Sequence, residues 1–93
     1  MLLRNGLVLW RELDGEAILL DPREGCSYNL NRVGTFIWKL LDGTRTIEGI
    51  AAALCEAYEV DYPQALRDVE QLVNELRSQK LLSESIAPAH PTV

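Results

Sequence analysis

The sequence predicts an α+β domain with strands in its first third and helices after them. Three observations support this: apolar residues recur every two positions up to about residue 31, they recur about every 3.6 positions beyond it, and Asp14-Gly15 is a strong hairpin-turn signal. The chain has 93 residues, 47% of them hydrophobic and 25% charged, which suits one globular core and leaves no room for a second.

The first two strands are expected at residues 7–13 and 16–21, joined by a two-residue turn that needs positive φ at both positions. Such a turn places Trp10 opposite Leu19, on one face of the sheet. The other face carries three further apolar residues: Leu9, Ile18 and Leu20. One face should cover the helices, and the other is either a contact surface or ordinary exposed apolar surface.

Turn residues at 21–25 lead into a third strand at 26–30, because proline fixes φ and glycine accepts a strained conformation. Along this strand Cys26, Tyr28 and Leu30 alternate with Ser27 and Asn29, as in a half-buried strand. In a three-stranded meander it forms an edge of the sheet.

Three helices are expected next, at residues 32–42, 47–58 and 62–79, and the third has the longest apolar stripe in the chain. A residue suited to capping precedes each of them: Asn31, Thr46 and Asp61. Residues 83–93 contain two prolines and no periodicity, so they are expected to form a flexible C-terminal tail after a domain at 1–82.

The net charge of −5 lies entirely in the part of the chain after residue 45, and an acidic surface repels phosphate backbones, so nucleic acid is not expected as a partner. No apolar run approaches the roughly 18 to 20 residues of a membrane span. The start of the chain lacks the apolar core of a signal peptide. A cytoplasmic location without membrane attachment is therefore expected.

Little in the sequence suggests catalysis. Cys26 and Cys55 are expected as unpaired thiols, and the histidine, His90, lies in the tail, where it is neither a metal ligand at useful spacing nor a base for Cys26. Asp42-Gly43-Thr44 lacks the lysine of a phosphate-binding loop. No cofactor, metal or enzymatic activity is expected.

An unpaired strand edge beside a long amphipathic helix is the remaining feature of interest. Such an edge can accept an extended peptide as an added strand, with main-chain amides giving affinity and side-chain pockets giving selectivity. The plainer reading is that every sheet has edges and that the apolar stripe of the third helix fills the core.

Several segments follow one another in a characteristic order: Ala17 to Gly25, Tyr28 to Asn31, Gly34, Ile37-Trp38, Leu40 to Gly43, Thr46-Ile47 and, later, Leu81-Leu82. In this order and spacing, over about residues 7 to 82, the chain resembles the PqqD-like family. These are the small peptide-recognition proteins of ribosomal peptide modification.

The resemblance implies a winged helix-turn-helix-like domain with a three-stranded antiparallel sheet followed by three helices. It also implies that the leader of a precursor peptide docks as a fourth strand against the third strand, in the groove beside the third helix. The domain, itself non-catalytic and without cofactor, would present the peptide to a radical S-adenosylmethionine protein or to a peptidase and cyclase system. The product would be pyrroloquinoline quinone or a related peptide-derived compound, and the turn at 20–25 looks closer to relatives such as those of lasso-peptide systems.

Carried over by position, the resemblance places peptide binding on the third strand and on the exposed flank of the third helix. The implied residues are Gly25, Cys26, Ser27, Tyr28, Asn29, Leu30, Arg67, Val69, Leu72, Val73 and Leu76. The Tyr28 amide is expected among the free donors of the edge, and Val73 on the wall of the groove.

Two other functions stay open. The same fold serves winged-helix DNA-binding regulators, but the charges of residues 62–80 cancel, whereas helices that read DNA grooves are usually rich in arginine and lysine. A dimerisation or scaffold module could instead pair through its sheet edge without any peptide. We expect a monomer or a weak dimer.

Overall fold

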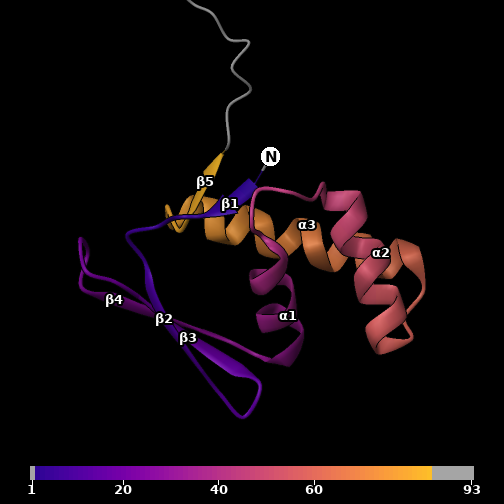
Figure 1. Ribbon diagram of the computed structural model, residues 1–93, viewed down its shortest axis with the longest axis horizontal. Coiled ribbons are helices and arrows are strands. Elements are labelled where there is room, and N and C mark those ends of the chain that lie inside the picture. The colour runs from indigo at the N-terminus through magenta and orange to yellow at the C-terminus, as the bar shows by residue number, and fades with distance from the viewer. Residues whose placement is uncertain (1, 85–93) are drawn as a thin grey trace, which may run out of the picture.

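The structure, a computed structural model, describes residues 2–84 (Figure 1). Strands precede helices, as predicted, and a further short strand lies at each end of this described chain. The elements are β1 (Leu2–Arg4), β2 (Leu9–Leu13), β3 (Glu16–Asp21), β4 (Cys26–Leu30), α1 (Arg32–Leu40), α2 (Ile47–Tyr58), α3 (Tyr62–Ser78) and β5 (Leu82–Glu84).

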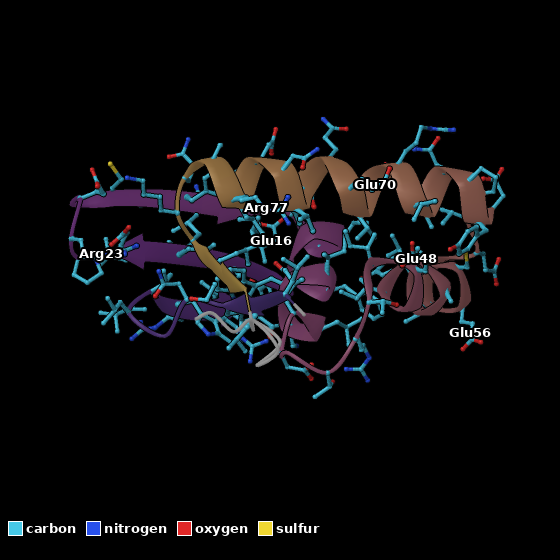
Figure 2. All side chains as sticks on the ribbon, turned by 90° about the horizontal axis from the view of Figure 1, so that it is seen from above. Glu16, Arg23, Glu48, Glu56, Glu70 and Arg77 are labelled. Atoms are coloured by element: carbon cyan, nitrogen blue, oxygen red, sulfur yellow. The ribbon has the colours of Figure 1, made fainter. Side chains whose placement is uncertain are left out.

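Strands β2, β3 and β4 form an antiparallel sheet in that order, which confirms the predicted meander. Asp14 and Gly15 both have positive φ, 56° and 82°, and Trp10 lies opposite Leu19. Figure 2 shows β4 as the strand nearest to α3 and β2 as the farthest. The sheet therefore presents one of its edges to the longest helix.

Strands β1 and β5 were not predicted. They pair with each other in a separate antiparallel sheet, with Leu3 opposite Ser83. The sequence did not predict them because a three-residue strand shows no alternation and its partner lies at the far end of the described chain. Residues 83 and 84, expected in the tail, thus belong to a strand. The rest of the expected tail, with His90, lies outside the described residues.

The expected first strand begins at Leu9 instead of residue 7. Before it, the Val8 amide donates to the Asn5 carbonyl at 3.0 Å and the Leu7 amide donates to Asn5 Oδ1 at 2.9 Å. These bonds form a turn, so the two residues ahead of Leu9 are not available for pairing with β3.

The three predicted caps are confirmed. Side-chain oxygens of Asn31, Thr46 and Asp61 accept hydrogen bonds from backbone amides three residues later, at 2.8, 3.0 and 2.9 Å. Helix α1 ends at Leu40, two residues before the predicted end, and Arg4 donates to the carbonyls of Trp38 and Lys39 there, at 3.0 and 2.9 Å. The Trp38 carbonyl also accepts from the Leu41 amide at 3.1 Å, and the arginine adds a side-chain donor to the last carbonyls of the helix, so it caps the C-terminus.

The core lies between the inner face of the sheet and the three helices. Its largest fully buried side chains are Trp38, Leu19, Ile37, Leu41, Ile50, Leu54, Leu76, Val69 and Val73. Trp10 meets Trp38 edge to face, with ring centroids 6.1 Å apart. The outer face carries exposed Leu9, Ile18 and Leu20, as predicted. Within residues 2–84, every helix is too short or too polar to cross a lipid bilayer.

Candidate functional site

The free edge of β4 exposes the main-chain groups of Ser27 and Asn29. Residues that flank a two-residue hairpin turn exchange both hydrogen bonds, so Leu13 and Glu16 bond to each other. By alternation, the next residue of β3, Ala17, points its main-chain groups toward β4, as does every second residue after it. The partners of these residues are Leu30, Tyr28 and Cys26, which therefore bond inward.

A buried hydroxyl supports this assignment. The Ala17 amide donates to Thr35 Oγ1 at 2.8 Å, and that hydroxyl donates to the Leu30 carbonyl at 3.4 Å, so Thr35 bridges the last pair of the two strands. The Ala17 amide thus points toward β4. The expectation that Tyr28 offers a free amide is wrong, because Tyr28 lies opposite Leu19 and bonds inward.

Helix α3 forms a wall opposite this edge. Four of its residues share one helical face and turn toward the start of α1: Asp68, Gln71, Leu72 and Glu75. Tyr28 joins edge and wall, because its hydroxyl donates to Glu75 Oε1 at 2.7 Å. Burial, followed by the hydrogen bond to the Glu75 carboxylate, raises the pKa of Tyr28 to about 12.

Two hollows follow one another along α3, the first beside β4 and the second beside the start of α1, and we call them together the groove. The turn-end hollow, of about 260 Å³, lies between residues 26–28 and residues 78–81. The α1-end hollow, of about 300 Å³, lies between Asn31, Val33, Gly34 and Ile37 and the wall of α3. Tyr28 lines the first hollow and Glu75 the second, so their hydrogen bond marks the boundary between them. Each is at or below the small end of ligand pockets, a size that suits a side chain.

An ion pair between buried Asp21 and exposed Arg23 anchors the turn between β3 and β4. Asp21 is 3% exposed, and its carboxylate accepts from Arg23 Nε and Nη2, both at 2.9 Å. The hydrogen bond from Arg23 holds the pKa of Asp21 below its usual value. Arg23, labelled in Figure 2, also donates to the Lys80 carbonyl at 2.9 Å, so the turn is tied to the end of α3. This contact fixes the width of the groove at that end.

The residues predicted on the strand lie where expected: Gly25 to Leu30 form the end of the turn and the edge. Three residues predicted for the wall do not. Val69, Val73 and Leu76 are at most 1% exposed, because the apolar stripe that they form faces the core. Leu72 does line the groove, whereas exposed Arg67 donates to Gln64 at 3.0 Å and lines neither hollow.

The sequence prediction placed the wall on the exposed flank of residues 67–76 but did not name Asp68, Gln71 and Glu75, which line it. Helical spacing from Leu72, at positions three or four residues away, would have found Asp68 and Glu75. Both cysteines are free: Cys26 is exposed on the edge and Cys55 is half-buried in α2. Between residues 2 and 84, no cluster of histidine, cysteine and acidic side chains has the arrangement of a metal site. The groove offers hydrogen bonds, apolar surface and carboxylates, which are means of binding.

A three-stranded antiparallel sheet followed by three helices, with β4 at its edge, defines a winged helix-turn-helix-like domain. A family model described as coenzyme PQQ synthesis protein D (PqqD) matches residues 16–82. The chain belongs to the PqqD family. The comparison with curated proteins gives no match.

Two solved structures are similar to the chain over nearly its whole length. "TbiB1 in Complex with the TbiA(beta) Leader Peptide" is 33% identical, with a TM-score of 0.80, and the match covers 91% of this chain and 98% of that one. "Lasso peptide synthetase B1 complexed with the leader peptide" is 26% identical, with a TM-score of 0.78, and the match covers 88% and 96%. Both similar proteins are thus described as bound to a leader peptide.

Proposed function

We propose that this domain binds the leader segment of a ribosomally made precursor peptide as a fourth strand, added to β4. The observation that carries the proposal is the free edge itself, where Ser27 and Asn29 direct main-chain donors and acceptors toward a groove walled by α3. A strand added there gains main-chain hydrogen bonds, and its alternate side chains enter the two hollows.

The comparisons support this proposal. Both similar structures are described as complexes with a leader peptide, and one of them is 33% identical over 91% of this chain. Because a docked edge needs no reacting groups, the domain acts as a non-catalytic chaperone without a cofactor. It works as a monomer or weak dimer in the cytoplasm, where precursors are made.

The docked peptide is then presented to a separate modifying enzyme. The matched family model points to pyrroloquinoline quinone biosynthesis, with a radical S-adenosylmethionine protein as partner, whereas the two similar structures point to a lasso-peptide-like system with a peptidase and a cyclase. The higher coverage and the 33% identity favour the second.

A pair of proline variants tests the binding mode. Asn29→Pro removes an outward amide from β4, and Glu12→Pro removes an outward amide from β2 at the opposite edge; proline is tolerated at such positions. Affinity for a synthetic leader, taken from the precursor encoded beside the gene, should fall about tenfold or more in the first variant and less than about twofold in the second.

A second experiment locates the binding site. Isotope-labelled protein is titrated with the same leader, and the changes in amide chemical shifts are measured. Shifts should concentrate on residues 25–31 and on the groove face of α3. Equal affinity of the two folded proline variants, or shifts confined to the β2–β3 hairpin, would place binding elsewhere. A tight homodimer that buries β4 in sedimentation and exchange measurements would also contradict the proposal.

A further inference from the structure

The groove is electrically uneven along its length. At the turn end, Asp21 is neutralised by Arg23, and the lining holds one other acid, Glu24, and one base, Lys80. At the α1 end, the lining holds two carboxylates, Asp68 and Glu75, and no described residue of that lining is positively charged. A peptide lying in the groove therefore meets different charge at its two ends.

The two carboxylates keep their negative charge while remaining available to a ligand. Asp68 accepts one hydrogen bond, from Gln64 Nε2 at 2.8 Å, through Oδ1. Glu75 accepts from Tyr28 through Oε1. Both donors are neutral side chains, so they do not cancel the charge, and the second oxygen of each carboxylate accepts no hydrogen bond from a described residue.

One counter-charge is present at this end. The N-terminus of α1, capped by Asn31, borders the α1-end hollow and carries roughly half an elementary positive charge. Two carboxylates exceed this by more than one full charge. The α1-end hollow therefore attracts a cation.

The register of an added strand says which peptide residue meets that hollow. Side chains opposite Cys26, Tyr28 and Leu30 share the inner face of the sheet with them, and alternate ones point away. The residue opposite Cys26 enters the turn-end hollow, and the residue opposite Tyr28 covers the bond to Glu75. We place the residue opposite Leu30 at the α1-end hollow, because Asn31, which follows Leu30 in the chain, lines that hollow.

We propose that Asp68 and Glu75 are specificity-determining residues that select a lysine or arginine at the leader position opposite Leu30. The stem of such a side chain packs along Leu72 and Val33 while its charged end lies between the two carboxylates, which are about two helical turns, roughly 10.5 Å, apart along α3 and both attract it. A leader with an acidic residue at this position is rejected. This inference rests on the proposed strand addition to β4. The test therefore distinguishes a failure of charge selection from a failure of strand addition.

The test measures affinity for the synthetic leader by calorimetry at low and at high salt. Asp68→Asn and Glu75→Gln keep an oxygen that accepts from Gln64 and from Tyr28, so each removes charge without removing these bonds. We expect each to weaken binding about three- to fivefold at low salt, and the loss should shrink in high salt. Replacing the basic leader residue with glutamate should weaken binding further in the unmodified protein than in the double variant.

Glu70→Gln is the matched control. Glu70 lies on the same helix (Figure 2) and is exposed, but it is five residues from Glu75, about 140° around the helix, and lines neither hollow. This variant removes the same charge and should bind like the unmodified protein. A loss equal to that of Glu75→Gln would assign the effect to net charge alone and overturn the inference.

Two further outcomes also overturn it. If Asp68→Asn and Glu75→Gln bind the leader unchanged while Asn29→Pro has lost binding, strand addition stands and charge selection fails. If Asn29→Pro binds the leader as well as the unmodified protein does, the leader does not add to β4. That outcome contradicts both the proposed binding site and the charge selection inferred from it. A leader that binds through β4 without any lysine or arginine in its docked strand would likewise contradict the selection.

Discussion

The sheet has two free edges in the described chain, and they differ in what lies beside them. Strand β2 turns the main-chain groups of Trp10 and Glu12 outward, just as β4 turns those of Ser27 and Asn29. Beside β4 stands α3, with one hollow between the strand and the end of this helix and a second between the start of α1 and α3. All five residues of β2 are exposed, and Figure 2 places this strand farthest from α3.

The difference separates two components of strand addition. Either edge can supply hydrogen bonds, but these are the same for every peptide and carry no sequence information. Selectivity needs pockets for alternate side chains. At β4 the wall of such pockets is α3, whereas the hollow of about 290 Å³ beside β2 is lined by Glu12 together with residues of α1. Glu12 on β2 forms an ion pair with Lys39, with 2.8 Å between the Lys39 ammonium and the Glu12 carboxylate. A charged side chain on an edge strand discourages pairing with a further strand.

The strongest way to break the contrast is to disrupt the core packing that holds α3 in place beside β4. Val73→Glu places a carboxylate at a position 1% exposed in the core, which should cost at least about 3 kcal/mol of unfolding free energy. That is a large share of the stability of a small domain. Urea denaturation measures the loss.

Its counterpart is Leu72→Glu, one residue earlier on the same helix. Leu72 is half-buried and faces the groove, so the variant should keep the fold and bind the synthetic leader several-fold more weakly. Equal destabilisation by the two variants would contradict the division of α3 into a core face and a groove face.

A smaller loss of unfolding free energy is expected when the hydrogen-bonded link between β3 and β4 is removed. Thr35→Val removes the hydroxyl that bridges Ala17 and Leu30, and a buried amide left without its acceptor costs about 1–3 kcal/mol. Thr35→Ser keeps the hydroxyl and should lose less. Hydrogen exchange should quicken at Ala17 in the valine variant, while amides of β2 keep their protection. A valine variant as stable as the serine variant would contradict the bridging role.

The smallest effect is a pH dependence confined to the β4 edge. The pKa of Tyr28 is raised to about 12, above the usual value of about 10, so the folded state holds this proton more tightly than the unfolded state. Its contribution to stability is complete below about pH 10 and is lost as pH rises to about 12. Tyr28→Phe should show a smaller loss over this range than the unmodified protein in urea denaturation. Identical pH profiles would refute the assignment.

Much of the fold could be predicted because its signals are local. The Asp14-Gly15 turn fixed the register of β2 and β3, and the three caps fixed the helix starts. The pairing of β1 with β5 could not be predicted, since neither strand is long enough to show a period and their partnership joins opposite ends of the described chain.

The candidate site divides in the same way. The edge strand follows from alternation along five residues, whereas the wall depends on how α3 is rotated against the sheet. Leu72 and Val73 are adjacent apolar residues in the sequence, and only the packing shows that one faces the groove and the other the core. Asp68 and Glu75 read as ordinary solvated acids until Tyr28 is seen to reach one of them.

The β1–β5 pair also bears on the order of folding. A strand that waits for a partner so far along the chain closes the longest loop in the domain, which is entropically costly and slow, whereas the β2–β3 hairpin closes within a few residues. During synthesis, Leu2–Arg4 emerge before the other described elements, and β5 emerges after all three helices. The segment after α1 reaches β1 earlier, since the Arg4 amide donates to the Leu41 carbonyl at 2.8 Å and the Gly43 amide donates to the Leu2 carbonyl at 3.0 Å. We therefore expect the pairing of β1 with β5 to be the last strand pairing of the described chain to form, with the groove complete before it.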